Sequence, residues 1–238
     1  MKGLLITLGA AAIAMSASFA VSAPAPFSYG YEADAVPESS SPSWARYYDG
    51  DYSASGGILT ATTPGTHGGS DPGYLEFQQT GSWAPVGSGT TVEVRLKTIS
   101  SNVNGWAGGM TIGIGSQFWP IYIGSSFITV AGGGTGDLAT TTSDDFHILR
   151  FTTDESSGDL NLYLDGNTTA AKTWNSAGSG SNVLSFGVQS SSQAGGTIQW
   201  DYIRWTNDGA YAPVAVPEPA ALSLLALGGL TMIRRRRA

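Results

Sequence analysis

The chain has 238 residues, no cysteine and a formal net charge of −7 at pH 7. The lack of cysteine excludes disulfides, thiolate metal sites and cysteine nucleophiles. Glu218, Lys2 and the four terminal arginines lie outside residues 24–215, which therefore hold 17 of the 18 acidic and 6 of the 11 basic residues, a net charge of −11. Such an acidic segment argues against nucleic acid as a partner, because phosphates need cationic contacts.

Residues 1–23 are typical of a secretory signal peptide. Met1-Lys2 gives a positive start, residues 3–20 are small and apolar, and Ser18-Phe19-Ala20 and Val21-Ser22-Ala23 both fit a small-x-small cleavage rule. The alternative is an uncleaved N-terminal anchor. We predict cleavage and export, and we leave this segment out of the fold.

Residues 24–206 have the length of one domain and the pattern of strands. Short β-branched and aromatic runs alternate with Gly-, Ser- and Thr-rich breaks. In 91–97, Val92, Val94 and Leu96 alternate with charged residues, so the charged ones are expected to face outward. The Asp165-Gly166 pair predicts a tight hairpin turn. The expected strands are 27–31, 57–62, 74–77, 91–97, 110–114, 118–123, 127–130, 146–151, 160–164, 170–174, 183–188 and 198–205.

No helix and no internal repeat is recognisable in this region, which argues against propellers and β-helices. Many antiparallel strands of this size bury one face by forming two packed sheets. The sequence therefore predicts an all-β, antiparallel two-sheet jelly-roll sandwich. Residues 207–215 are expected to be a linker.

Two segments carry a resemblance to a known fold superfamily. Residues 146–151, Phe-His-Ile-Leu-Arg-Phe, and residues 158–166, ending in Asp-Gly, resemble the adjacent strand pair of concanavalin A-like (laminin-G-like) jelly rolls. The strand 200–205 is similar to the closing strand of that superfamily. The resemblance implies a fold shared by lectins, glycosidases and adhesion modules, and it leaves the function open.

The residues offer no recognisable catalytic motif. A glycosidase resembling the family 16 group would carry Glu-x-Asp-x-Glu on one strand, so that alternation aligns the carboxylates on one face. The nearest run, Glu32-Ala33-Asp34 followed by Glu38, has the wrong spacing and is interrupted by Pro37. The sequence therefore predicts a protein that is not an enzyme.

Four aromatic residues are candidate carbohydrate contacts, because they lie among polar and small residues. They are Trp44, Tyr47, Trp83 and Trp106. The alternative for each is a buried plug over the core, since large aromatic side chains are mostly buried. Asp49 and Asp51 form a candidate Ca²⁺ pair, although two carboxylates flanking a glycine also suit a simple turn. No other cofactor is expected.

The C-terminal residues 216–238 have three parts in a fixed order. Val216, Pro217, Glu218 and Pro219 form a rigid turn, residues 220–233 are uncharged, and Arg234, Arg235, Arg236 and Arg237 would stop translocation. As a helix the uncharged part would be about 21 Å long, a short membrane span. This tail resembles the PEP-CTERM sorting signal of Gram-negative bacteria. The resemblance implies an exosortase, a membrane-embedded cysteine transpeptidase, as partner, with cleavage near Pro217–Pro219. An ordinary C-terminal membrane anchor is the alternative.

Together these observations predict an exported protein that is held transiently in the inner membrane and then delivered to the cell surface or extracellular matrix. The first hypothesis is a lectin-like domain that binds extracellular polysaccharide or serves as an adhesion module. The second is a glycan-active enzyme with an unfamiliar active site. An ice-binding protein comes third, because it would need a regular threonine array that the sequence lacks.

Overall fold

The computed structural model describes residues 27–48, 50–62, 75–79, 83, 89–102, 105–153, 156–188 and 196–214. These residues all belong to a compact unit, Ser22–Ala215. The expected signal peptide and the tail from Val216 onward lie outside the described residues. Within the described residues, no helix has the length and apolar character needed to cross a membrane.

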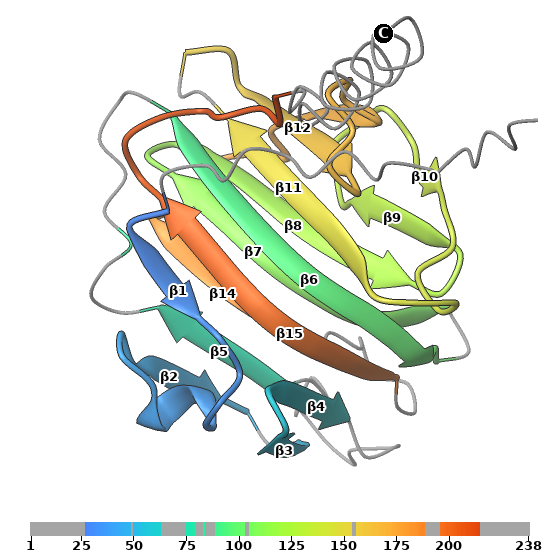
Figure 1. The fold of residues 1–238 in the computed structure, drawn as a ribbon. Helices are drawn as coiled ribbons and strands as arrows, with labels where there is room; N and C mark the ends of the chain where they lie inside the picture. Colours follow the sequence, from blue (N-terminus) through green and yellow to red (C-terminus); the bar gives the residue numbers. More distant parts are fainter. Residues whose placement is uncertain are drawn as a thin grey trace, which may run out of the picture. The chain divides into compact units, whose positions relative to one another are not determined.

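The described strands form two layers of antiparallel strands (Figure 1). Sheet A, in front in this view, has the order β13 (Lys172–Asn175), β12 (Asp159–Leu164), β11 (His147–Thr153), β6 (Thr90–Ser100), β15 (Thr197–Thr206), β4 (Ile58–Thr62) and β3 (Asp51–Ser55), with β1 (Tyr29–Tyr31) also paired to β15. Sheet B, behind it, has the order β10 (Leu138–Ala139), β9 (Phe127–Val130), β8 (Gln117–Gly124), β7 (Trp106–Ile114), β14 (Val183–Val188), β5 (Leu75–Gln79) and β2 (Trp44–Tyr47). A 3₁₀ turn, η1 (Pro37–Ser39), precedes β2. The predicted all-β, two-sheet jelly-roll sandwich is confirmed.

The core lies between the two sheets, and strand alternation places residues into it. Val92, Val94 and Leu96 of β6 are buried, as their spacing predicts. Five tryptophans are among the largest fully buried side chains: Trp44, Trp119, Trp174, Trp200 and Trp205. A cysteine-free domain is therefore held together by a large aromatic core, in which Trp44 contacts Phe186 and Trp205 edge-on.

The outer face of sheet A differs from the expectation of a simple solvated surface. Glu93 and Arg150 point away from the core but are only 7% and 4% exposed. The guanidinium of Arg150 donates to Glu93 from Nε at 2.7 Å, and the hydroxyl of Tyr202 donates to the same carboxylate at 3.0 Å. The ring of Phe27 lies over Arg150, 5.7 Å from its guanidinium carbon. Glu93 and Arg150 can be buried because each satisfies the charge of the other.

The turn after β12 is longer than the predicted tight hairpin. Asp165 and Gly166 adopt the positive φ values that the predicted turn type requires, 51° and 74°. However, β12 and β13 pair only from Leu162 and Lys172 onward, so residues 165–171 form the connection. The Asp165 side chain makes a contact with the start of β11.

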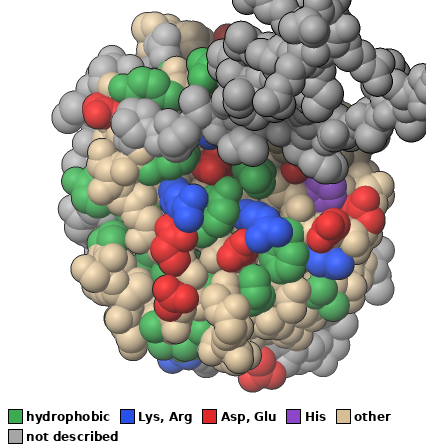
Figure 2. Space-filling view, in the orientation of Figure 1, with side chains coloured by type: hydrophobic (Ala, Val, Ile, Leu, Met, Phe, Trp, Pro, Cys, Tyr) green, Lys and Arg blue, Asp and Glu red, His purple; other side chains and the backbone are tan. Residues whose placement is uncertain are grey.

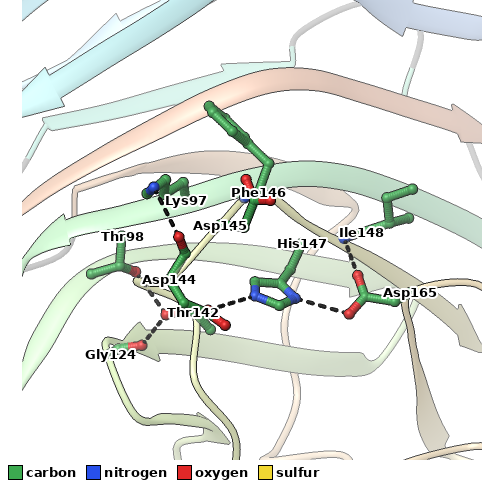
Figure 3. Close-up of polar contacts among 10 residues, drawn as sticks. All are labelled: Lys97, Thr98, Gly124, Thr142, Asp144, Asp145, Phe146, His147, Ile148 and Asp165. Atoms are coloured by element: carbon green, nitrogen blue, oxygen red, sulfur yellow. Dashed lines mark hydrogen bonds and ion pairs between the residues drawn. The ribbon is translucent and has the colours of Figure 1, made fainter.

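That contact is centred on His147, the first residue of β11 (Figure 3). Its Nδ1 lies 2.8 Å from a carboxylate oxygen of Asp165, and its Nε2 lies 2.9 Å from one of Asp144. The other oxygen of Asp165 accepts a bond from the Ile148 amide at 2.9 Å. Asp145 accepts a bond from the Phe146 amide. His147 therefore joins the loop before β11 to the turn after β12, and we call His147, Asp144 and Asp165 the histidine clamp.

Candidate functional site

Two of the four aromatic residues predicted to contact carbohydrate lie inside the protein, which corrects those predictions. Trp44 is 2% exposed and packs in the aromatic core. Trp83 is 7% exposed, belongs to the same core cluster, and its indole N–H donates to the Gly113 carbonyl at 2.9 Å. The sequence misplaced Trp44 in a loop because β2 is a short, polar edge strand that alternation does not reveal. Neither ring is presented to solvent.

Trp106 and Tyr47 remain at the surface, and both lie on sheet B. Trp106 begins β7 at a β-bulge and stacks on Tyr122 of β8, with ring centroids 4.7 Å apart and planes inclined by 22°. Burial raises the pKa of the Tyr122 phenol. Tyr47, at the end of β2, is 45% exposed. Sequence reasoning missed Tyr122, although the alternation of Trp119, Ile121 and Ile123 into the core assigns it to the opposite face.

A row of residues connects these aromatic side chains across the outer face of sheet B. Directly paired residues are Tyr122 with Gly109, Gly109 with Gly187, Gly187 with Glu76, and Glu76 with Tyr47. Paired residues in an antiparallel sheet point to the same side. Residues adjacent to the row in sequence are buried in the core: Ile121, Met110, Phe186 and Phe77. The row therefore faces away from sheet A, and spans about 19 Å, or four strand spacings.

A second row runs beside the first and consists of Pro120, Thr111, Ser185 and Gln78. Thr111 and Ser185 are 6% and 0% exposed, while Gln78 is half-buried. The Ser185 hydroxyl has no hydrogen-bond partner among the described residues. In the first row, position 187 has room only for glycine, since a Cβ there would lie 2.0 Å from the Leu75 carbonyl oxygen. We call these two rows, together with Trp106, the sheet B face.

The sheet B face combines three chemical features. The stacked pair Trp106 and Tyr122 stands at one side, short side chains form the middle, and Glu76, Gln78 and Tyr47 stand at the other side. Glu76 is the one acidic residue on the described strands of sheet B. A flat aromatic platform with a few polar groups suits a ligand with both apolar faces and hydroxyl groups.

Two of the other carboxylates that the sequence singled out, Glu32 and Glu38, are paired with arginines. Glu32 accepts two bonds from Arg204, at 2.8 and 2.7 Å. Glu38 accepts from the Tyr52 hydroxyl at 2.6 Å and lies 3.6 Å from Arg46. Asp51 is the exposed first residue of β3, whereas Asp49 lies outside the described residues. Across the described part of the chain, no group of three potential ligands is close enough to hold a metal ion.

Comparison with known proteins establishes the fold. No family model matches the sequence, and no curated protein sequence is similar to it. Among solved structures, a native glycosidic hydrolase aligns with a TM-score of 0.55 and 14% identity, over 77% of this chain and 97% of the other. A prokaryotic β-1,3-1,4-glucanase from a mouse hindgut metagenome aligns with a TM-score of 0.53 and 14% identity, over 75% of this chain and 98% of the other. A carbohydrate esterase from a Shiga toxin-encoding bacteriophage aligns with a TM-score of 0.50 and 14% identity, over 74% of this chain and 95% of the other.

These neighbours correct one prediction. The expectation that the protein is not an enzyme rested on the missing Glu-x-Asp-x-Glu run. Yet the chains that share this sandwich along most of their length are named for carbohydrate hydrolysis and for carbohydrate ester cleavage. The absence of one family's motif therefore does not exclude catalysis on this fold. At 14% identity the likeness establishes the jelly-roll sandwich, and the activity has to be argued from the residues.

Proposed function

We propose that the protein is a carbohydrate-active enzyme that binds a polysaccharide chain across the sheet B face. The observation that carries this proposal is the row from Tyr122 through Gly109 and Gly187 to Glu76 and Tyr47. The two glycines keep the middle of the row low, with side chains standing at both sides. A chain of sugar rings fits such a face because it is long, flat and covered with hydroxyl groups.

The two sides of the face have different roles in this proposal. The Trp106–Tyr122 pair is already stacked at 4.7 Å, so it presents a preformed aromatic surface to a sugar ring. Preformed contacts lower the entropy cost of binding. Gln78 and Tyr47 supply hydrogen bonds to hydroxyl groups. The acidic net charge of −11 on the exported segment favours a neutral chain over an acidic one.

Glu76 is the group that we assign to the chemical step. It is half-buried and forms no ion pair with the other described residues, in contrast to Glu32 and Glu93, which are bound by arginines. A carboxylate without a cation is free to act as a general acid or base toward a bound sugar. Glycoside hydrolysis requires a second carboxylate, about 5–9.5 Å away. The described strands of sheet B do not provide it.

The first experiment measures binding and turnover separately on the purified full-length protein. Mixed-linkage β-1,3-1,4-glucan is the probe, with binding followed by affinity electrophoresis and turnover by the release of reducing ends. Trp106→Ala should weaken binding by about tenfold or more, because it removes one of the two stacked rings of the aromatic surface. Glu76→Gln should keep binding and lower turnover by about 10²-fold or more.

Two outcomes would contradict the proposal. If wild-type protein and Trp106→Ala bind the glucan equally well, the sheet B face is not the binding site. If the protein binds the glucan but releases no product, the sheet B face remains the binding site, and the catalytic role assigned to Glu76 is wrong. Ile99→Ser is the matched control, because Ile99 is 50% exposed at the surface of sheet A.

We also propose that the tail directs the protein through an exosortase to the cell surface or extracellular matrix. The support is the order of its three parts: Val216–Pro219, the uncharged residues 220–233, and the arginines 234–237. Replacing Pro217, Glu218 and Pro219 by alanine should abolish processing and leave the protein in the inner membrane. Fractionation of exosortase-positive and exosortase-negative cells tests this. Equal processing in both cell types would overturn it.

A further inference from the structure

A pocket of about 300 Å³ opens on the outer face of sheet A, where β1 pairs with β15. It is lined by Phe27, Ser28, Tyr29, Gly30, Glu32 and Arg204. Figure 2 looks onto this face and shows basic, acidic and hydrophobic side chains side by side across it. This β1 pocket belongs to the opposite sheet from the sheet B face, so the function proposed above does not use it.

The polar wall of the β1 pocket is a fixed ion pair. Arg204 donates from Nε to one oxygen of Glu32 at 2.8 Å and from Nη2 to the other at 2.7 Å. The guanidinium carbon also lies 4.1 Å from the centre of the Tyr202 ring, so the group is held from its edge and its face. The hydrogen bonds to Glu32 use Nε and Nη2, which leaves Nη1 of the guanidinium and further lone pairs of the carboxylate. The wall therefore offers donors and acceptors with no net charge.

The aromatic side of the β1 pocket is formed by Phe27, whose ring is held by its contact with the Arg150 guanidinium. Tyr29 also borders the pocket, but it pairs directly with the buried Trp205, and its ring stacks on Trp205 with centroids 5.6 Å apart and planes inclined by 19°. The Tyr29 ring therefore lies on the opposite side of β1 from Gly30 and Arg204, and Phe27 supplies the ring on the pocket side.

Gly30 keeps the β1 pocket open. It pairs directly with Arg204, so any side chain at position 30 would point to the same face. A Cβ there would lie 3.0 Å from Oε1 of Glu32 and 3.5 Å from Cγ of Arg204. A larger residue at this position would therefore fill the space between β1 and the ion pair.

We infer that the β1 pocket is a second carbohydrate-binding site, which takes one or two rings of a neutral saccharide. A neutral ion pair can donate to and accept from adjacent hydroxyl groups, and the Phe27 ring packs against the ring carbons. An acidic sugar would meet no uncompensated cation here, because Arg204 is bound by Glu32. The choice of a saccharide as the ligand rests on the proposed function, whereas the location of the site does not. Two sites on opposite sheets would let one molecule cross-link two polysaccharide chains.

The test is a site-resolved titration of the full-length protein by ¹H–¹⁵N correlation NMR. The probes are four neutral tetrasaccharides, of β-1,3-glucan, β-1,4-glucan, β-1,4-mannan and β-1,4-xylan. At least one should shift the amide signals of Ser28 and Gly30 in a saturable manner. The amides of Gly109 and Gly187 report separately on the sheet B face. Failure of either site is therefore distinguishable from failure of the other.

Two variants assign the shifts to the pocket. Gly30→Val should abolish the saturable shift of the Ser28 amide and leave the shifts of the Gly109 and Gly187 amides unchanged. Trp106→Ala should abolish the shifts of the Gly109 and Gly187 amides and leave that of the Ser28 amide unchanged. If Gly30→Val fails to fold, as judged by loss of signal dispersion, Phe27→Ala replaces it, with an expected loss of affinity of about tenfold. Ile99→Ser should leave both sets unchanged. The inference is overturned if none of the four probes shifts Ser28 and Gly30 in the wild type, or if a folded Gly30→Val variant keeps the Ser28 shift intact.

Discussion

The outer faces of the two sheets follow opposite designs. On sheet A, charges meet charges: Arg150 with Glu93, Arg204 with Glu32, Arg95 with Asp201, and the histidine clamp. On sheet B, the two rows hold small, amide and aromatic side chains and a single carboxylate, Glu76. A face whose charges are internally compensated stabilises the fold. On sheet B the polar groups within reach of a ligand are the half-buried Glu76 and Gln78 and the exposed Tyr47. Predictions on the two faces should therefore differ in kind.

The largest expected effect is on sheet A, from breaking the buried pair. Arg150→Met leaves the Glu93 carboxylate buried without its cation, which should cost about 3–5 kcal/mol in the free energy of unfolding. Urea denaturation measures this. The double variant Glu93→Leu with Arg150→Met should recover most of the loss, because no charge then remains buried. A loss below about 1 kcal/mol in the single variant would show that water reaches the pair.

The next effect is on binding and belongs to sheet B. Trp106→Ala should weaken polysaccharide binding by about tenfold or more, while Trp44→Ala should destabilise the fold by about 3–5 kcal/mol, because it empties the aromatic core. Titration and urea denaturation of both variants separate the two roles. Equal losses of stability in the two variants would remove the distinction between the surface ring and the core ring.

The histidine clamp predicts a dependence on pH. Burial alone would lower the pKa of His147, but its hydrogen bonds to Asp144 and Asp165, together with their charges, raise it above the ordinary value. A raised pKa in the folded state means that the clamp contributes its full stability below about pH 6.5 and loses it as the pH rises through the folded pKa. Lys97 and Asp145 are the other charged groups next to the clamp.

His147→Gln measures this contribution. Urea midpoints of the wild type and the variant should differ most at about pH 5.5 and converge toward about pH 9, because the charged imidazole is then lost from the wild type. NMR titration of the imidazole should give a pKa above that of a free histidine. If the urea midpoints of the wild type and the variant differ by the same amount at both pH values, the charged form of His147 does not stabilise the fold.

The smallest effect is expected for an exposed pair on the same sheet. Arg95 and Asp201 form an ion pair with side chains 39% and 25% exposed. Water screens such a pair, so Arg95→Gln should change the free energy of unfolding by about 0–1 kcal/mol. Compared with Arg150→Met in the same urea series, this variant separates burial from the mere presence of an ion pair. A loss as large as that of Arg150→Met would show that burial is not the deciding factor.

Local pattern alone was sufficient to predict the type of structure. The alternation of Val92, Val94 and Leu96 with charged residues marks a strand with one buried side, and repeated Gly- and Ser-rich breaks limit strands to sandwich length. The tail 216–238 and the N-terminal residues 1–23 are likewise chemical patterns in the sequence. Their interpretation as sorting and secretion signals stays a prediction.

The tertiary structure alone decided which residues form a site. Trp44 and Trp106 have similar small and polar neighbours in the sequence, but β2 points one into the core and the bulge in β7 points the other outward. Glu93 follows the alternation of an exposed residue, yet Arg150 and Tyr202 bury it. The row that ends at Glu76 and Tyr47 draws on strands far apart in the chain. Strand register brings these residues together, and register depends on long-range pairing that a local pattern does not encode.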